Sequence, residues 1–264
     1  MNRIDKKFKA LKARHKKAFI AFLTAGYPDL STTERLVIEF EKNGADIIEL
    51  GIPFSDPIAD GPVIQMSSYE SLKKGTTLTK VLALIARLRK KSAIPLAVMT
   101  YYNPILSYGP FRFVRDAVKS GLDAVIIPDL PPEEETDFSK EAARRGLRMI
   151  LFISPTTSRE RIRFIARRAK GFIYFVSLTG VTGARRALPV ELKSQLRAVK
   201  KIAGATPVCA GFGVSTHEQV RVVSSYGDGV IVGSAIIRKI SENLSNPDLV
   251  GIVADFVRRL KGRQ

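Results

Sequence analysis

Residues 46–65 have the sequence DIIELGIPFSDPIADGPVIQ, in which a short apolar run leads into a loop broken by proline and glycine. Three isoleucines and a leucine form this run, which is typical of a parallel strand buried on both faces. Glu49 lies inside the run, where an ionised carboxylate is costly unless it stands at the strand end and has a function there. The stretch therefore predicts a buried parallel strand that ends in a functional site.

Two more carboxylates, Asp56 and Asp60, lie on the loop that follows the strand. A mobile loop of this kind can carry a carboxylate over a bound ligand. Two simpler interpretations stay open at this point. Glu49 could form a salt bridge at a sheet edge, and Asp60 could cap a helix that begins near Pro62.

Apolar runs alternate with amphipathic segments along the whole chain, which is the pattern of a parallel sheet with crossover helices. We predict strands at 18–23, 46–50, 96–99, 124–127, 148–153, 172–176, 206–209 and 229–232. We predict helices at 31–43, 78–91, 110–120, 132–145, 159–169, 189–202, 216–225 and, after a short turn at Ser234, 247–260. Eight such units in 264 residues favour a (β/α)8 TIM barrel, formed as a single domain over residues 1–264, although a doubly wound sheet fits the pattern too.

Unusual residues fall at the predicted strand ends, where barrel enzymes hold their ligands. These residues are Glu49, Tyr101 to Asn103, Asp129, Ser154, Gly211 to Gly213, and Gly233 with Ser234. The pair Gly211 and Gly213 follows the seventh strand, and the pair Gly233 and Ser234 follows the eighth; glycine lets backbone N–H groups approach a phosphate closely. Each pair alone could be an ordinary turn, but together they predict one large pocket with a phosphate site.

The composition limits the possible chemistry. A single cysteine, Cys209, excludes an intramolecular disulfide and a multi-thiolate metal site, and suits a reducing compartment. The two histidines, His15 and His217, have no plausible metal or nucleophile partner nearby in sequence, so acid–base work falls to carboxylates or tyrosine and no metal is predicted. With no apolar run of about 18 residues, we expect no membrane association and a cytoplasmic location.

The formal net charge of +18 raises the question of an acidic or nucleic-acid partner. Most lysines and arginines are scattered over the predicted helices, as on solvated outer faces. Only the N-terminus concentrates them, around an apolar stripe of Ile4, Phe8 and Leu11 at helical spacing. No zinc finger, aromatic RNA-binding signature or repeat accompanies this stretch, so we expect no nucleic-acid binding.

The motif ELGIPFSDPIADGP at 49–62 resembles the signature of the tryptophan synthase alpha subunit, the indole-3-glycerol-phosphate lyase family. Similar stretches are LTAGYPD at 23–29, YYNPI at 101–105 and IIPDLPPE at 126–133. The resemblance covers nearly the whole chain. It implies a TIM barrel with extra helices at the N-terminus and after the second and eighth strands.

The resemblance also implies a function, the cleavage of indole-3-glycerol phosphate to indole and glyceraldehyde 3-phosphate by a carbon–oxygen lyase of L-tryptophan biosynthesis. This reaction needs no cofactor in this chain. Pyridoxal phosphate would belong to a beta subunit, with which the chain would form an allosteric alpha2beta2 heterotetramer. The basic surface is the departure from the family, whose members are commonly acidic or near neutral, and it leaves docking of the partner open.

Residue roles follow from the same resemblance. Glu49 would be the acid–base group, Asp60 would accept the indole N–H, and the Tyr174 hydroxyl would lie near the reacting carbons. The substrate-binding residues would be Phe22, Ile64, Met99, Tyr101, Ile126 and Phe212 around the indole, Thr182 bonded to Asp60, and Gly183, Gly213, Gly233 and Ser234 at the phosphate. Pro53 and Asp56 would face the beta subunit.

Alternatives from other classes make different demands on the sequence. A related isomerase would need a lysine or histidine at a strand end, and a non-catalytic regulator would be expected to lose Glu49 or Asp60. A basic RNA-binding barrel would bind with a steep salt dependence and show no turnover. A stand-alone indole-3-glycerol-phosphate lyase, independent of a beta subunit, remains the alternative within the same chemistry.

Overall fold

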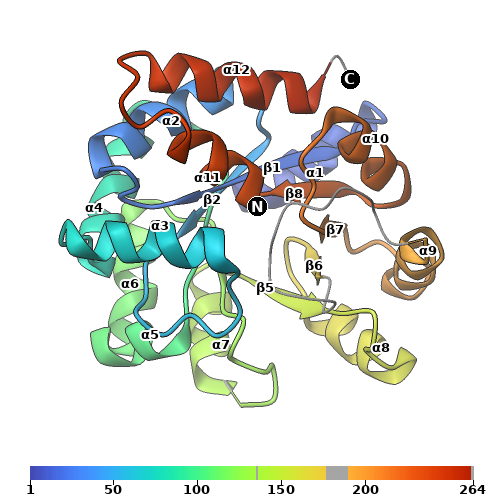
Figure 1. Ribbon diagram of the computed structural model, residues 1–264. Helices are drawn as coiled ribbons and strands as arrows, with labels where there is room; N and C mark the ends of the chain where they lie inside the picture. Colours follow the sequence, from blue (N-terminus) through green and yellow to red (C-terminus); the bar gives the residue numbers. More distant parts are fainter. Residues whose placement is uncertain (135, 177–189, 263–264) are drawn as a thin grey trace.

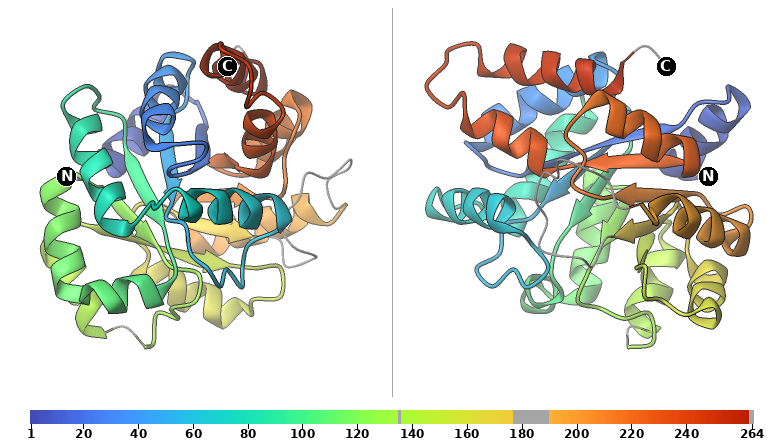
Figure 2. Two further views of the ribbon diagram at one scale, coloured as in Figure 1. Left: turned by 60° about the vertical axis from the view of Figure 1, so that its left-hand side comes forward. Right: turned by 45° about the vertical axis from the view of Figure 1, so that its right-hand side comes forward.

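The computed structural model describes residues 1–134, 136–176 and 190–262, and helices surround its strands (Figures 1 and 2). Eight parallel strands pair in sequence order and close into a barrel in which β8 pairs with β1. They are β1 (Ala18–Thr24), β2 (Ile47–Gly51), β3 (Leu96–Met99), β4 (Ala124–Ile126), β5 (Arg148–Ile153), β6 (Ile173–Val176), β7 (Val208–Gly211) and β8 (Gly229–Val232). Closure confirms the predicted TIM barrel, because a doubly wound sheet would leave two open edges.

The helices include the crossover helices of the barrel and the extra helices that the resemblance implied. They are α1 (Arg3–Ala13), α2 (Leu30–Lys42), α3 (Pro62–Lys73), α4 (Leu78–Arg89), α5 (Tyr102–Tyr108), α6 (Pro110–Ser120), α7 (Thr136–Arg144), α8 (Arg159–Arg168), α9 (Leu192–Ala203), α10 (His217–Tyr226), α11 (Ser234–Ser241) and α12 (Leu249–Lys261). The last helix packs along α2, at the top of Figure 1. The helix after β2 is α3, and the helix after β8 is α11.

Several boundaries differ from the prediction. The seventh strand begins at Val208 rather than at residue 206, because the Thr206 N–H already bonds to Ala203 and Pro207 has no N–H to donate. The predicted turn at Ser234 is instead the first residue of α11. No signal in the sequence indicated α5, whose first N–H, on Tyr102, is satisfied by the Asp129 carboxylate after β4.

The apolar stripe of the N-terminal helix closes one end of the barrel. Ile4, Phe8 and Leu11 are buried in the same cluster as the inward-facing strand residues. The ring of Phe8 lies 5.8 Å from that of Phe172, just before β6. The predicted amphipathic helix is therefore a plug at the amino ends of the strands, and the opposite, carboxyl end stays available for a site.

Three aspartates hold this plug in place. Each stands directly before a strand, accepts a hydrogen bond from the backbone of the preceding strand, and pairs with a cation of the N-terminal segment. The pairs are Arg3 with Asp123 at 3.1 Å, Lys7 with Asp46 at 3.7 Å and Lys17 with Asp228 at 3.9 Å. The respective backbone donors are the N–H groups of Leu96, Phe19 and Val208. Part of the concentrated basic charge therefore has its partners within the fold.

Candidate active site

A cavity of about 100 Å³ lies where the strands end. It brings together most of the predicted site residues, although they come from distant parts of the chain. The cavity is lined by Phe22, Glu49, Asp60, Ile64, Met99, Tyr174, Val176, Gly211, Gly213, Ile231, Gly233 and Ser234. The register of the barrel explains this, since Glu49 on β2 is level with Phe22 on β1 and with Ala97 on β3.

Glu49 is fully buried, and neither of its carboxylate oxygens has a hydrogen-bond partner among the residues that the structure describes. Burial, followed by the charge of Asp60, raises its pKa from 4.5 to about 8. The simpler interpretation, a salt bridge at a sheet edge, is excluded because the closed barrel has no sheet edge and no cation among the described residues pairs with Glu49. A buried carboxyl with free oxygens at a cavity wall is suited to moving a proton at neutral pH.

Asp60 is held from the loop side by an aromatic hydroxyl. The Tyr101 hydroxyl donates to Asp60 Oδ2 at 3.0 Å and accepts from the Ala59 N–H at 2.9 Å. Burial raises the pKa of Asp60, whereas the Tyr101 hydrogen bond acts in the opposite direction and favours the carboxylate. Asp60 does not cap α3, whose N-cap is Gly61, so its side chain is directed to the cavity instead.

Tyr174 forms part of the floor of the cavity. Its ring lies 5.1 Å from that of Phe152 and 6.4 Å from that of Phe172, which fixes its orientation. A Cβ at Gly211 would come within 2.9 Å of this ring, so glycine is required at the end of β7. Burial raises the pKa of Tyr174 well above 10, and its hydroxyl therefore stays protonated as a hydrogen-bond donor.

Phe22 supplies an apolar wall that two glycines make possible. A Cβ on Gly51 would lie 2.6 Å from the Phe22 ring, and one on Gly233 would lie 3.2 Å from the Phe22 side chain. Both positions therefore exclude larger residues as long as Phe22 keeps this orientation. The flat ring faces the same cavity as Ile64 and Met99, and these three side chains offer an apolar surface to an aromatic ligand.

On the opposite side of the cavity, the backbone of two glycines and of a helix start faces the cavity. Gly213 has a φ of 65°, a conformation that favours glycine, and Gly233 is the N-cap of α11. Ser234 is the first residue of that helix, so N–H groups of its first turn, which have no partner within the helix itself, lie at the cavity. Such a helix start with neighbouring glycines is suited to bind an anion.

Some predicted residues do not line the cavity. Tyr101 acts on it through Asp60, and Ile126 is fully buried in the cluster inside the barrel. Phe212 is turned away and packs 5.3 Å from Phe175. Their contact with a ligand stays a prediction. Thr182 and Gly183 lie outside the described residues.

Of the two predicted partner-facing residues, Pro53 is buried and Asp56 is exposed on the loop after β2.

Two cavity residues were not predicted, namely Val176 and Ile231. Gly211 belonged to a motif that we assigned to phosphate binding. Glycine is needed there because the ring of Tyr174 fills the space that a side chain would occupy. Ile231 could have been found from strand alternation, because it lies two residues before Gly233 on the same face of β8. Val176 could have been found in the same way, because it lies two residues after Tyr174 on the same face of β6.

Two absences apply to residues 1–134, 136–176 and 190–262. No group of three or more histidine, cysteine, aspartate or glutamate side chains is placed to hold a metal ion there. None of the helices in these ranges is long and apolar enough to cross a membrane.

Comparisons with known proteins extend over almost the whole chain. A family model described as tryptophan synthase alpha chain matches residues 8–256. The tryptophan synthase alpha chain of Geotalea daltonii is 49% identical over 261 residues, which cover 99% of this chain and 98% of that relative. A crystal structure of the tryptophan synthase alpha chain from Legionella pneumophila has a TM-score of 0.90 and 38% identity, over 98% of this chain and 96% of that chain. A tryptophan synthase complex from Pyrococcus furiosus matches with a TM-score of 0.84 and 36% identity, over 93% of this chain and 98% of that chain.

Proposed function

The chain belongs to the tryptophan synthase alpha chain family, and from this premise we propose how its own residues carry out the family's reaction. That reaction is the alpha reaction of tryptophan biosynthesis, in which a lyase cleaves indole-3-glycerol phosphate to indole and glyceraldehyde 3-phosphate. The bond between indole C3 and the adjacent glycerol carbon breaks. C3 gains a proton, and the hydroxyl on the departing carbon loses one as that carbon becomes the aldehyde.

Glu49 is the group that moves both protons. With a pKa of about 8, its protonated form predominates at neutral pH and can donate to indole C3. The resulting carboxylate can then take the proton of the glycerol hydroxyl as the carbon–carbon bond breaks, which restores the acid. The observation that carries this assignment is the fully buried Glu49 carboxyl, with neither oxygen bonded to a described residue.

Asp60 stabilises the charge that develops on the indole. Protonation at C3 leaves a positive charge spread toward the ring nitrogen, whose N–H would donate to the Asp60 carboxylate. The Tyr101 hydrogen bond, at 3.0 Å, keeps that carboxylate in one orientation and favours its ionised form. The two neighbouring carboxyl groups therefore have different roles, because Glu49 acts as the acid and Asp60 acts as the anion.

The remaining cavity residues position the substrate. Phe22, Ile64 and Met99 form the surface that holds the indole ring, with Ile126 and Phe212 behind it. Gly213, Gly233 and Ser234 bind the phosphate through backbone N–H groups at the start of α11. Tyr174 presents its protonated hydroxyl near the reacting carbons. Thr182 and Gly183 complete this proposal as contacts to Asp60 and to the phosphate, on the family resemblance alone.

The partner in this proposal is a tryptophan synthase beta subunit in an alpha2beta2 heterotetramer. The loop after β2 would contact it, with exposed Asp56 in the interface and buried Pro53 shaping the loop. No cofactor is assigned to this chain, and pyridoxal phosphate belongs to the partner. The proposed location is the cytoplasm, which suits a chain whose one cysteine is a free, buried thiol.

An indole-release assay on the purified chain, with and without a beta subunit, tests the proposal. Glu49→Gln keeps the shape of the side chain but cannot transfer the proton, so turnover should fall about 10²- to 10⁴-fold. Glu218→Gln, an exposed change on α10, is the matched control and should keep wild-type turnover. Glycerol phosphate affinity should be the same in both variants.

Turnover of Glu49→Gln within a few-fold of wild type would remove this residue from the mechanism. The beta subunit should raise turnover by about 5- to 150-fold if it favours the closed loop. Glycerol phosphate should tighten the binding of the beta subunit by the same factor by which the beta subunit tightens the binding of glycerol phosphate. High activity of the isolated chain, together with a beta affinity that glycerol phosphate does not change, would support the stand-alone lyase instead.

A further inference from the structure

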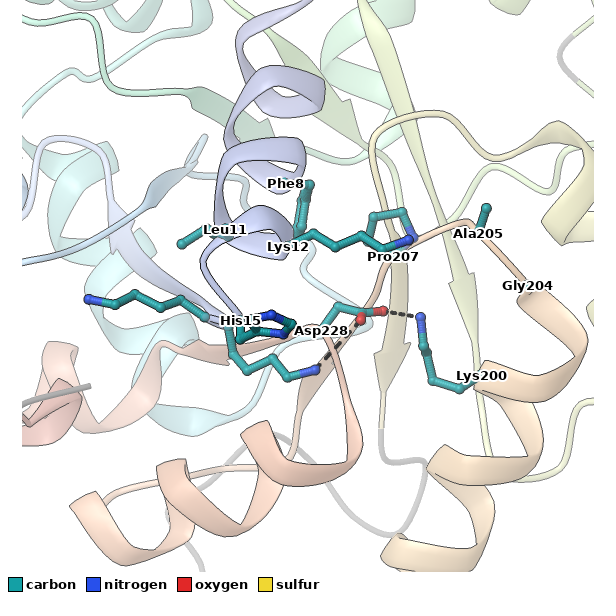
Figure 3. Close-up of a pocket in the computed structure, with 11 residues that line it drawn as sticks. Phe8, Leu11, Lys12, His15, Lys200, Gly204, Ala205, Pro207 and Asp228 are labelled. Atoms are coloured by element: carbon teal, nitrogen blue, oxygen red, sulfur yellow. Dashed lines mark ion pairs between the residues drawn. The ribbon is translucent and has the colours of Figure 1, made fainter.

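A second pocket lies at the amino end of the barrel, opposite the catalytic cavity. It has a volume of about 270 Å³ and is formed where α1 ends, where α9 turns into β7, and where β8 begins (Figure 3). Lys12 and His15 border it from the end of α1, and Lys200 borders it from α9. The alpha reaction uses the carboxyl ends of the strands, so it gives this pocket no role.

The charges around this pocket do not cancel. Its lining includes Lys12, Lys16, Lys17 and Lys200 but only one acidic side chain, Asp228. That carboxylate is already shared, because Lys200 approaches it at 2.5 Å and Lys17 at 3.9 Å. The side-chain ammonium groups of Lys12 and Lys16 have no ion pair or hydrogen bond to any residue in the described ranges. The pocket therefore holds an excess of positive charge that an anion would neutralise.

The rest of the wall is apolar. Phe8 and Leu11 from α1 meet Ala205 and Pro207 from the turn before β7. In Figure 3 the Lys12 side chain extends from α1 toward Pro207, so its ammonium group lies beside this apolar wall. A ligand that fits both parts of the surface must combine an anionic head with an apolar body.

We propose that this pocket binds a small organic phosphate, whose dianionic head contacts the lysines and whose apolar body packs on Phe8 and Pro207. Lysine ammonium groups bind phosphate as point charges, and several around one pocket favour a dianion over a monoanion. The apolar wall distinguishes an organic phosphate from inorganic phosphate, because burial of apolar surface adds to the affinity. This proposal does not depend on the residue roles assigned to the catalytic cavity.

The two histidines of the chain allow a local test. His15 lines the pocket, whereas His217 begins α10 beyond the carboxyl end of β7 and its Nδ1 lies 3.0 Å from the Leu260 carbonyl. NMR spectra of the imidazole rings, recorded on the full chain during titration with phenyl phosphate, inorganic phosphate and phenol, report on each place separately. Inhibition of indole release, measured in parallel, reports binding at the catalytic end.

The His15 resonances should shift along a saturable curve with phenyl phosphate while those of His217 stay in place. Inorganic phosphate should bind more weakly, and phenol should leave His15 unchanged. The double variant Lys12→Gln/Lys16→Gln should weaken phenyl phosphate binding by roughly tenfold, or about 1.4 kcal/mol. The control Lys6→Gln/Lys9→Gln removes the same charge from exposed positions outside the pocket and should change the affinity less than about twofold.

Two outcomes would overturn the proposal. The first is a His15 resonance that shows no saturable shift with phenyl phosphate up to about 10 mM. The second is an equal loss of affinity in the two double variants, which would mean that the anion responds only to the overall basic charge. Neither outcome alters indole release, so the failure of this site and the failure of the catalytic assignment are distinguishable.

Discussion

The hydroxyl of Tyr101 donates a 3.0 Å hydrogen bond to the carboxylate of Asp60, although the two residues are 41 positions apart in the chain. The same hydroxyl accepts the N–H of Ala59 at 2.9 Å, so Tyr101 holds both the side chain and the backbone of the loop that carries Asp60. This contact joins the end of β3 to the loop after β2. It orients the anion of the cavity without lining the cavity itself.

Tyr101→Phe should reduce turnover by roughly 10- to 100-fold, because a hydrogen bond to a charged group is worth about 1.5 to 3 kcal/mol. The loss should appear in kcat, with glycerol phosphate affinity unchanged. Tyr102→Phe removes the same atom from the next residue, whose ring packs on Phe138, and should keep wild-type kinetics. Steady-state assays of the two variants make the comparison, and equal kinetics in both would refute a role for the Tyr101 hydroxyl.

Glu49 should make the protein less stable as the pH rises. Its pKa is about 8 in the folded state, and we take the ordinary value of 4.5 for the unfolded state. Between these pH values the folded state keeps a proton that the unfolded state has released. Its contribution to the free energy of unfolding is fully present below about pH 4.5, falls by at most about 1.4 kcal/mol per pH unit, and levels off above about pH 8.

Urea unfolding of wild type and Glu49→Gln, from about pH 5 to about pH 9, isolates this contribution because glutamine does not titrate. The unfolding free energy of the variant minus that of wild type should grow up to about pH 8 and then stay constant. A difference that is the same at every pH would contradict a raised pKa for Glu49.

Gly213→Val should weaken glycerol phosphate binding, by about tenfold or more, with the fold intact. The branched side chain would occupy the space where phosphate oxygens meet backbone N–H groups. Valine at a φ of 65° also carries strain, so the control is Gly146→Val, at a φ of 80° and with nothing within 4 Å of the added Cβ. Calorimetry on both variants separates the two effects. Wild-type affinity in Gly213→Val would refute this placement of the phosphate.

Asp123→Ala should lower the free energy of unfolding by about 3 to 5 kcal/mol. The change leaves the largely buried Arg89 guanidinium without its carboxylate at 2.8 Å and the Leu96 N–H without its acceptor. Asp255→Ala, which breaks exposed pairs on α12, should have little effect. Urea unfolding of both variants provides the measurement. Similar small losses in the two would show that the aspartates before the strands do not anchor the fold.

The sequence by itself determined the barrel and the two central carboxylates. Buried parallel strands carry nearly continuous apolar runs, and these are visible without any knowledge of neighbours in space. Glu49 was visible for the same reason, as a charged residue inside such a run. Asp60 was marked by the proline and glycine residues that define its loop. The sequence pattern was sufficient wherever a feature depends on residues that are neighbours in the chain.

Only the tertiary structure decided the features that depend on contacts between distant residues, which barrel closure brings together. The start of α5 requires the carboxylate of Asp129, 27 residues away from Tyr102 in the chain. Three of the N-terminal cations, Arg3, Lys7 and Lys17, are explained by aspartates before β4, β2 and β8. Glycine at position 211 is explained by the ring of Tyr174 on the neighbouring strand. Sequence periodicity reports the faces of single elements, whereas these contacts follow from the register between strands, which is set when the barrel closes.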